Sequence, residues 1–103
     1  MPAVARIGDP FATGHPCDGA STIAGGSGNV FANGIGVSRR GDPSASHTRL
    51  VGKLCLPHTV PIAGGSATVF VNSMSIARVG DAIDAGAITG GSPDVFCRRM
   101  TGH

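Results

Sequence analysis

The sequence predicts an all-β domain, small in size and built from three β-hairpin repeats related by pseudo-threefold symmetry. Three observations support this fold class. Glycine is abundant, at 17 of 103 residues, without the every-third-residue spacing of collagen. An 18-residue block occurs twice, and no stretch sustains the 3.6-residue periodicity of a helix. Because so short a chain has no room for a second core, we expect a single domain over residues 1–103.

The repeated block runs from Gly25 to Asp42 and again from Gly64 to Asp81. The two copies align without gaps and are identical at nine positions. Residues 4–9 match the end of a third block, and residues 90–96 match its beginning. Two complementary halves predict that the terminal segments pair and close a ring, which also removes exposed sheet edges.

Each complete block carries the signals of a β-hairpin. Apolar runs at 30–32 and 69–71 predict the first strands. Asn33-Gly34 predicts a two-residue turn because both residue types tolerate positive φ, and Asn72-Ser73 is a weaker form of the same signal. One Arg and one Asp recur in every block, and recurrence favours a structural role over catalysis. These residues are Arg6, Arg39, Arg78, Asp9, Asp42 and Asp81.

Composition and charge exclude several functions. The net charge is only +2, and the basic pairs Arg39-Arg40 and Arg98-Arg99 have no interleaved aromatic residues, so no nucleic-acid partner is expected. No apolar run approaches the length that spans a bilayer, and no basic segment followed by an apolar one begins the chain. We expect a protein made in the cytoplasm without a signal peptide.

The segments that join the blocks hold the residues suited to metal binding. His15 and Cys17 lie in the first segment, and His47, Cys55 and His58 lie in the second. A closed threefold fold would bring these segments out at the same end of the domain. Imidazole and thiolate groups suit zinc, and a structural zinc site usually has four ligands. Three histidines and one cysteine, either Cys55 or Cys17, would meet that requirement.

The three cysteines are odd in number and form no close C-x-x-C pair. This pattern favours thiol ligands or buried thiols over a disulfide framework. Cys97 follows the strand-like pair Val95-Phe96, at a block position that holds Ala32 and Val71 in the other copies. Small apolar equivalents predict that Cys97 is a buried thiol.

At this point the chain resembles a known family, the PAAR-repeat proteins of type VI secretion systems and contractile phage tails. The resemblance rests on residues 1–9, on Ala-Arg-Val-Gly-Asp at 77–81, and on the repeated Gly-Ser-x-x-Val-Phe-x-Asn pattern. It implies a conical β fold with a flat base on a trimeric β-helical spike. It also implies a zinc ion at the apex, held by three histidines and one cysteine.

Carried over by position, the histidine ligands are His15, His47 and His58. The family's cysteine position falls at Ala85, which cannot bind a metal. Either Cys55 or Cys17 replaces it, water completes the site, or the metal is absent. We prefer Cys55 as the fourth ligand.

The resemblance implies a non-enzymatic tip that caps and sharpens the spike for membrane puncture, with a role as an effector adaptor for cargo. Such a protein is secreted through a contractile injection system or lies at a phage tail tip, and contacts the target membrane transiently. Two alternatives are a zinc-stabilised binding module without a spike partner and, less favoured, a zinc-dependent hydrolase. Because the chain lacks Glu, a hydrolase would need Asp18 or Asp84 as its base.

Overall fold

The computed structural model describes residues 2–14 and 17–97, which form ten short strands and no helix. The strands pair consecutively as five antiparallel hairpins. Their bounds are β1 Pro10–Ala12, β2 Ala20–Thr22, β3 Phe31–Ala32, β4 Ile35–Gly36, β5 His47–Val51, β6 Leu54–His58, β7 Phe70–Val71, β8 Met74–Ser75, β9 Ala82–Ile83 and β10 Gly86–Ala87. Across this part of the chain, no helix has the length and apolar character to cross a bilayer.

The two hairpin turns that the sequence predicts are confirmed. β3 pairs with β4 through Asn33 and Gly34, whose φ angles are 55° and 74°. β7 pairs with β8 through Asn72 and Ser73, whose φ angles are 53° and 67°. Positive φ at both central residues matches the twist of the flanking strands, which is why Asn is favoured here and why Ser is the weaker choice.

A closed ring of backbone hydrogen bonds joins the three repeats. Ala5 N donates to Ala77 O at 3.0 Å, Ala77 N donates to Ser38 O at 3.0 Å, and Ser38 N donates to Ala5 O at 2.9 Å. These residues are the same position of three successive blocks, and all three are fully buried. The ring therefore confirms the predicted pseudo-threefold closure and marks its axis.

The third repeat is assembled from the two ends of the chain. Val4 N donates to Val95 O at 3.0 Å. Nη2 of Arg6 donates to Gly91 O at 3.4 Å, just as Arg39 donates to Gly26 O at 3.4 Å within the first block. Contacts made inside one continuous block are thus reproduced between residues 85 positions apart.

The recurring arginines and aspartates pair within their own repeats. Nε of Arg39 lies 2.9 Å from Oδ2 of Asp42, and the backbone N of Arg39 donates to the same oxygen at 2.8 Å. Arg6 with Asp9 and Arg78 with Asp81 repeat this arrangement. The hydrogen bond to the carboxylate raises the pKa of each arginine above its usual value. These residues therefore close turns, as their recurrence predicts.

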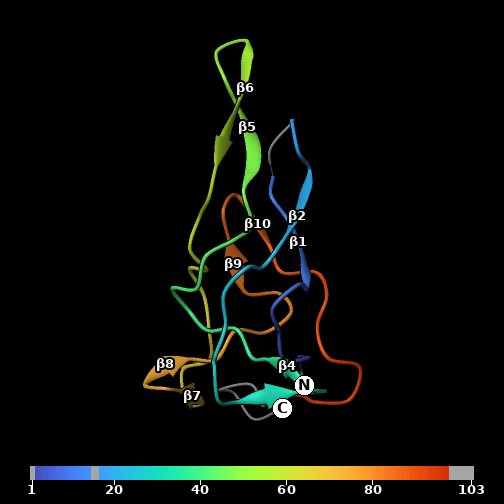
Figure 1. The fold of residues 1–103 in the computed structure, drawn as a ribbon, viewed down its shortest axis with the longest axis vertical. Helices are drawn as coiled ribbons and strands as arrows, with labels where there is room; N and C mark the ends of the chain where they lie inside the picture. The colour runs from blue at the N-terminus through green and yellow to red at the C-terminus, as the bar shows by residue number, and fades with distance from the viewer. Residues whose placement is uncertain (1, 15–16, 98–103) are drawn as a thin grey trace.

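The molecule is conical, with principal extents of 44 × 29 × 24 Å. Figure 1 shows the broad end at β4, β7 and β8, with both ends of the described chain nearby, and the β5–β6 hairpin as the narrow end. The main core lies between these ends. It consists of Ala5, Phe11, Ile23, Ile62, Ala77, Ile83 and Ile88.

Candidate metal centre

Two histidines meet at the foot of the β5–β6 hairpin. His47 begins β5 and His58 ends β6, and the strand register places them directly opposite each other. A third donor comes from the turn between β9 and β10, where Asp84 has a positive φ of 57°. Aspartate tolerates this conformation better than most residues, which allows a two-residue turn to present the carboxylate.

One carboxylate oxygen contacts both imidazoles. Oδ2 of Asp84 lies 2.9 Å from Nε2 of His47 and 3.0 Å from Nε2 of His58. The exposed fraction of the side chain is 8% for Asp84, 3% for His47 and 18% for His58. One donor atom from each residue lies within 4.8 Å of the other two. The three residues form a candidate metal-binding triad.

The tautomer of His47 tests whether this triad suits a cation. Nδ1 of His47 lies 3.0 Å from Ala45 O. A carbonyl oxygen only accepts hydrogen bonds, so Nδ1 carries a proton and a neutral His47 directs its Nε2 lone pair at Asp84. A lone pair that faces a carboxylate is electrostatically unfavourable unless a positive charge accompanies it. A metal ion bound by both groups, or a second proton on the ring, would supply that charge. The hydrogen bond to Ala45 is also the usual second contact of a metal-bound histidine. The donor set fits a metal ion.

The first inter-block segment is anchored beside this triad. Ala85 N donates to Thr13 O at 3.0 Å. A Cβ at Gly14 would lie 2.7 Å from both Ala85 Cβ and Ala85 O, so only glycine allows this approach. His15, one of the predicted ligands, lies outside the described residues, as does the terminal His103. Gly14, the residue before His15, packs against Ala85, the residue after Asp84.

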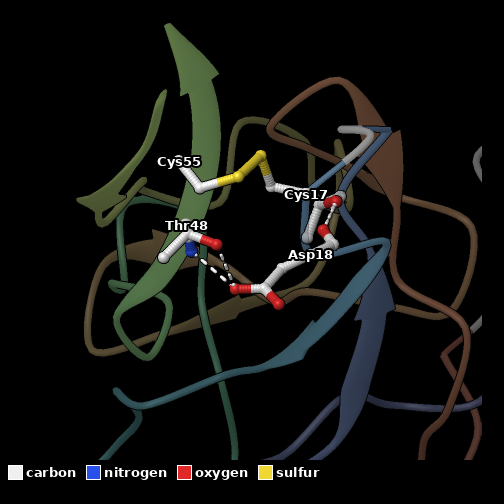
Figure 2. The surroundings of a disulfide bond; sticks show 5 residues. Cys17, Asp18, Thr48 and Cys55 are labelled. Carbon is white, nitrogen blue, oxygen red and sulfur yellow. Dashed lines mark hydrogen bonds between the residues drawn. A yellow bond between two sulfur atoms is a disulfide. The ribbon is translucent and has the colours of Figure 1, made fainter. Parts of the chain in front are cut away.

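The prediction for Cys55 is wrong in this structure. Cys55 forms a disulfide with Cys17 across a sequence separation of 38, with the Cα atoms 6.0 Å apart (Figure 2). A sulfur held in a disulfide has no thiolate to offer a metal, so neither Cys55 nor its alternative Cys17 can be a ligand in this state. The odd number and wide spacing of the cysteines predict thiols, and this prediction is also wrong for Cys17 and Cys55. The two inter-block segments lie side by side, which brings cysteines far apart in the sequence together.

A second contact reinforces the same junction. Oδ2 of Asp18 accepts hydrogen bonds from the backbone N and from Oγ1 of Thr48, both at 2.7 Å (Figure 2). These two bonds lower the pKa of Asp18 below its ordinary value of 3.8. The disulfide and the Asp18 carboxylate therefore clamp the first segment to the β5–β6 hairpin, at two residues that lie between His47 and His58 in the sequence.

The buried thiol predicted at Cys97 is confirmed. Cys97 is 4% exposed and packs in a second apolar cluster with Val4, Ala32 and Val71. Ala32 and Val71 are its equivalents in the other two blocks, so the three positions come together around the axis as the repeat predicts.

Asp84 is the donor that the sequence did not reveal as a ligand. The sequence suggests Asp84 only as the base of a hydrolase, because the ligand position of the family pattern falls on the next residue, Ala85. The signal was present in the sequence: Asp84 is the one carboxylate in the third inter-block segment, which has neither histidine nor cysteine. Threefold closure brings each of the three inter-block segments to the same end of the domain, so a ligand from the third segment is consistent with the symmetry.

The fold and the triad define a class of protein: a small, closed, pseudo-threefold β cone with a candidate metal-binding group near its narrow end. The family model for the PAAR motif matches residues 13–90. The chain belongs to the PAAR-motif family, whose members are structural spike tips of secretion and phage systems. A search of curated proteins finds no match.

Proposed function

We propose that this protein is a non-enzymatic tip that caps a trimeric β-helical spike and sharpens it for membrane puncture. Membership of the PAAR-motif family supports a spike-tip role. The observation that carries the proposal is an apolar surface at the broad end of the cone, repeated three times around the axis.

This surface, here called the base ring, consists of two consecutive residues from each block. The valines are 37–39% exposed and the phenylalanines are 47–59% exposed. The base ring is formed by Val30, Phe31, Val69, Phe70, Val95 and Phe96. Three of the four phenylalanines in the chain are therefore held at the surface, at equivalent positions, in a protein with no Trp and no Tyr. Apolar side chains gathered in this way mark an interaction surface.

The pseudo-threefold symmetry supports a trimeric partner. A pseudo-threefold monomer can offer each chain of a true threefold trimer a nearly equivalent surface, as a one-to-three cap requires. Burying a phenylalanine side chain contributes about 1.5–3 kcal/mol, so three of them give a sizeable favourable contribution before the cost of association. Phe31 begins β3, which pairs with β4, and Phe70 begins β7. Figure 1 shows β4 and β7 at the broad end, opposite the β5–β6 hairpin.

We infer that zinc binds at the triad, with His15 as the fourth ligand beside His47, His58 and Asp84. Anchoring of Thr13 and Gly14 against Ala85 supports this fourth position. Deep burial of His47 and Asp84 supports a structural ion over a hydrolytic one, because a catalytic zinc needs an accessible open position. A structural zinc contributes on the order of 10 kcal/mol of apparent binding free energy in small peptides. Such an ion would stiffen the narrow end.

In this proposal the protein is made in the cytoplasm and delivered by a contractile injection system, or sits at a phage tail tip. Effector cargo and transient contact with the target membrane complete its expected partners. The Cys17–Cys55 disulfide is compatible with this route if it forms after delivery, since disulfides persist in oxidising compartments.

The test is co-purification with a trimeric β-helical spike protein from the same source. We expect one chain per trimer by native mass spectrometry. Phe31→Asp or Phe70→Asp should abolish the complex, whereas Leu54→Asp at the opposite end should leave it intact. Failure of the wild-type chain to bind a spike, with zinc still present, would favour a zinc-stabilised binding module without a spike partner.

A further inference from the structure

The tip of the β5–β6 hairpin is apolar and exposed. Its four large aliphatic side chains, Leu50, Val51, Leu54 and Leu56, are 43–65% exposed. Neither the metal-binding triad nor the base ring uses them. Leu54 has the most exposed side chain among the large hydrophobic residues that the structure describes. Exposed apolar side chains add nothing to the stability of the fold, so this arrangement indicates an external partner.

Both faces of the hairpin are apolar at its tip. The register pairs Leu50 with Cys55 and Val51 with Leu54, and successive residues of a strand point to opposite faces. Leu50 therefore projects from one face and Val51 and Leu54 from the other. A flat protein surface would cover only one of these faces, whereas a fluid medium can surround the whole tip.

The charges on the hairpin have a single sign. Arg49 and Lys53 are exposed, and no acidic residue occurs between Asp42 and Asp81. The acidic side chains that lie against the hairpin are at its foot, where Asp18 bonds to Thr48 and Asp84 contacts the two histidines. Cations flanking an apolar tip complement a surface of anionic headgroups over hydrocarbon.

The hairpin is held at two points along its length. The hydrogen bonds of Thr48 hold its foot, and the disulfide joins Cys17 to Cys55, which lies one residue pair from the turn (Figure 2). Beyond them the chain turns through Gly52 and Lys53, with φ of 63° at Gly52, as a two-residue turn requires. A clamped hairpin loses little conformational freedom when its tip enters another phase.

We propose that this hairpin tip inserts into the interface of an anionic lipid bilayer, with Leu50, Val51 and Leu54 in the acyl region and Arg49 and Lys53 on the phosphates. Five residues per strand reach about 17 Å, roughly half the hydrocarbon thickness. The unpaired outer edges of β5 and β6 limit this depth further, because hydrocarbon cannot satisfy backbone polar groups. Insertion is therefore shallow. The choice of a membrane as the partner of the tip rests on the proposed function. Lipid binding can nevertheless be measured without a spike.

The chain contains no Trp and no Tyr, so a single introduced Trp reports its own surroundings. In Leu54→Trp, we expect the emission to shift to the blue with vesicles of phosphatidylglycerol and phosphatidylcholine, and to be quenched by brominated acyl chains. Phe70→Trp on the base ring is the matched control, and its emission should stay that of a water-exposed indole. Unshifted emission from Leu54→Trp on these vesicles would overturn the proposal.

Vesicle flotation then separates the contributions. Leu54→Asp should weaken binding by about tenfold or more, because a buried leucine is lost and a charge must enter the interface. Arg49→Ser and Lys53→Ser should each weaken binding to anionic vesicles by about fivefold, and pure phosphatidylcholine should bind less of the wild-type chain. Equal binding to both vesicle types would contradict the assignment of the cations.

Two further outcomes distinguish this inference from others. If Leu54→Asp retains the spike complex and loses the vesicles, while Phe70→Asp does the reverse, the two ends act independently. A spike complex without lipid binding would overturn only the lipid proposal, and lipid binding without a spike would overturn only the cap. Concentration-dependent dimerisation that Leu54→Asp abolishes would assign the hairpin tip to a second copy of the chain, against our proposal.

Discussion

Oδ2 of Asp84 lies 2.9 Å from Nε2 of His47, although 37 residues separate them in the sequence. The contact joins the β9–β10 turn to the foot of the β5–β6 hairpin. The family pattern places a cysteine at position 85, and here the carboxylate of the preceding residue, Asp84, faces the histidines instead. Substitution of Asp84 is therefore the most direct test of the candidate metal site.

Asp84→Ala should lower zinc affinity by at least about tenfold, because it removes a buried anionic donor next to two imidazoles. His47→Ala should lower it at least as much. Elemental analysis of purified protein and competition with a chelator measure both. Asp18→Ala is the matched control, since Asp18 bonds to Thr48 and not to the triad. Full zinc content in Asp84→Ala would remove Asp84 from the site.

Reduction of the Cys17–Cys55 disulfide should destabilise the fold without releasing the metal. Opening a loop of this separation costs about 3–4 kcal/mol in the chain-entropy account. Urea unfolding with and without a reducing agent measures the change in the free energy of unfolding. Cys55→Ser should match the reduced wild-type chain, keep its zinc and show no response to reductant. Loss of zinc from Cys55→Ser would instead restore Cys55 as a ligand.

Asp18 should make stability depend on pH in acid. The hydrogen bonds from Thr48 hold its pKa below 3.8 in the folded state, so the ionised form favours folding. This contribution is present above the unfolded-state pKa and disappears as the pH falls through the lower folded-state pKa. Wild type should therefore be more stable than Asp18→Asn at neutral pH, and the gap should close below about pH 4. Urea unfolding in the presence of a chelator compares both chains in the metal-free state, so that release of metal in acid does not affect the result. A difference in stability that persists in strong acid would contradict the assignment.

The pseudo-threefold axis should tolerate no added volume. Ala77 is fully buried and takes part in the hydrogen-bonded ring with Ala5 and Ser38. Ala77→Val should lower the free energy of unfolding by about 1–3 kcal/mol, because the extra methyl groups have no space. Ala67→Val, at an exposed position of the same block, should change it by less than about 0.5 kcal/mol. Similar effects from both substitutions in thermal unfolding would argue against a packed axis.

The repeat was sufficient to predict most of the fold. Each turn and each strand pair within a block depends on residues close in sequence, and Asn33-Gly34 or Asn72-Ser73 specifies its turn locally. Closure of the ring was predictable too, because residues 4–9 and 90–96 complete one block between them. The buried position of Cys97 followed from its equivalents by the same rule.

The contents of the narrow end were only partly predictable. His47 and His58 meet because they close one hairpin, which a pairing register can suggest. The Cys17–Cys55 disulfide and the approach of Asp84 each join separate inter-block segments of different lengths, whose reach is not encoded in any repeat. By itself the sequence determined the threefold β framework, because short-range turn chemistry and self-similarity define it. Only the tertiary structure decided which cysteines pair and which carboxylate faces the histidines, because those choices depend on distances between segments far apart in the chain.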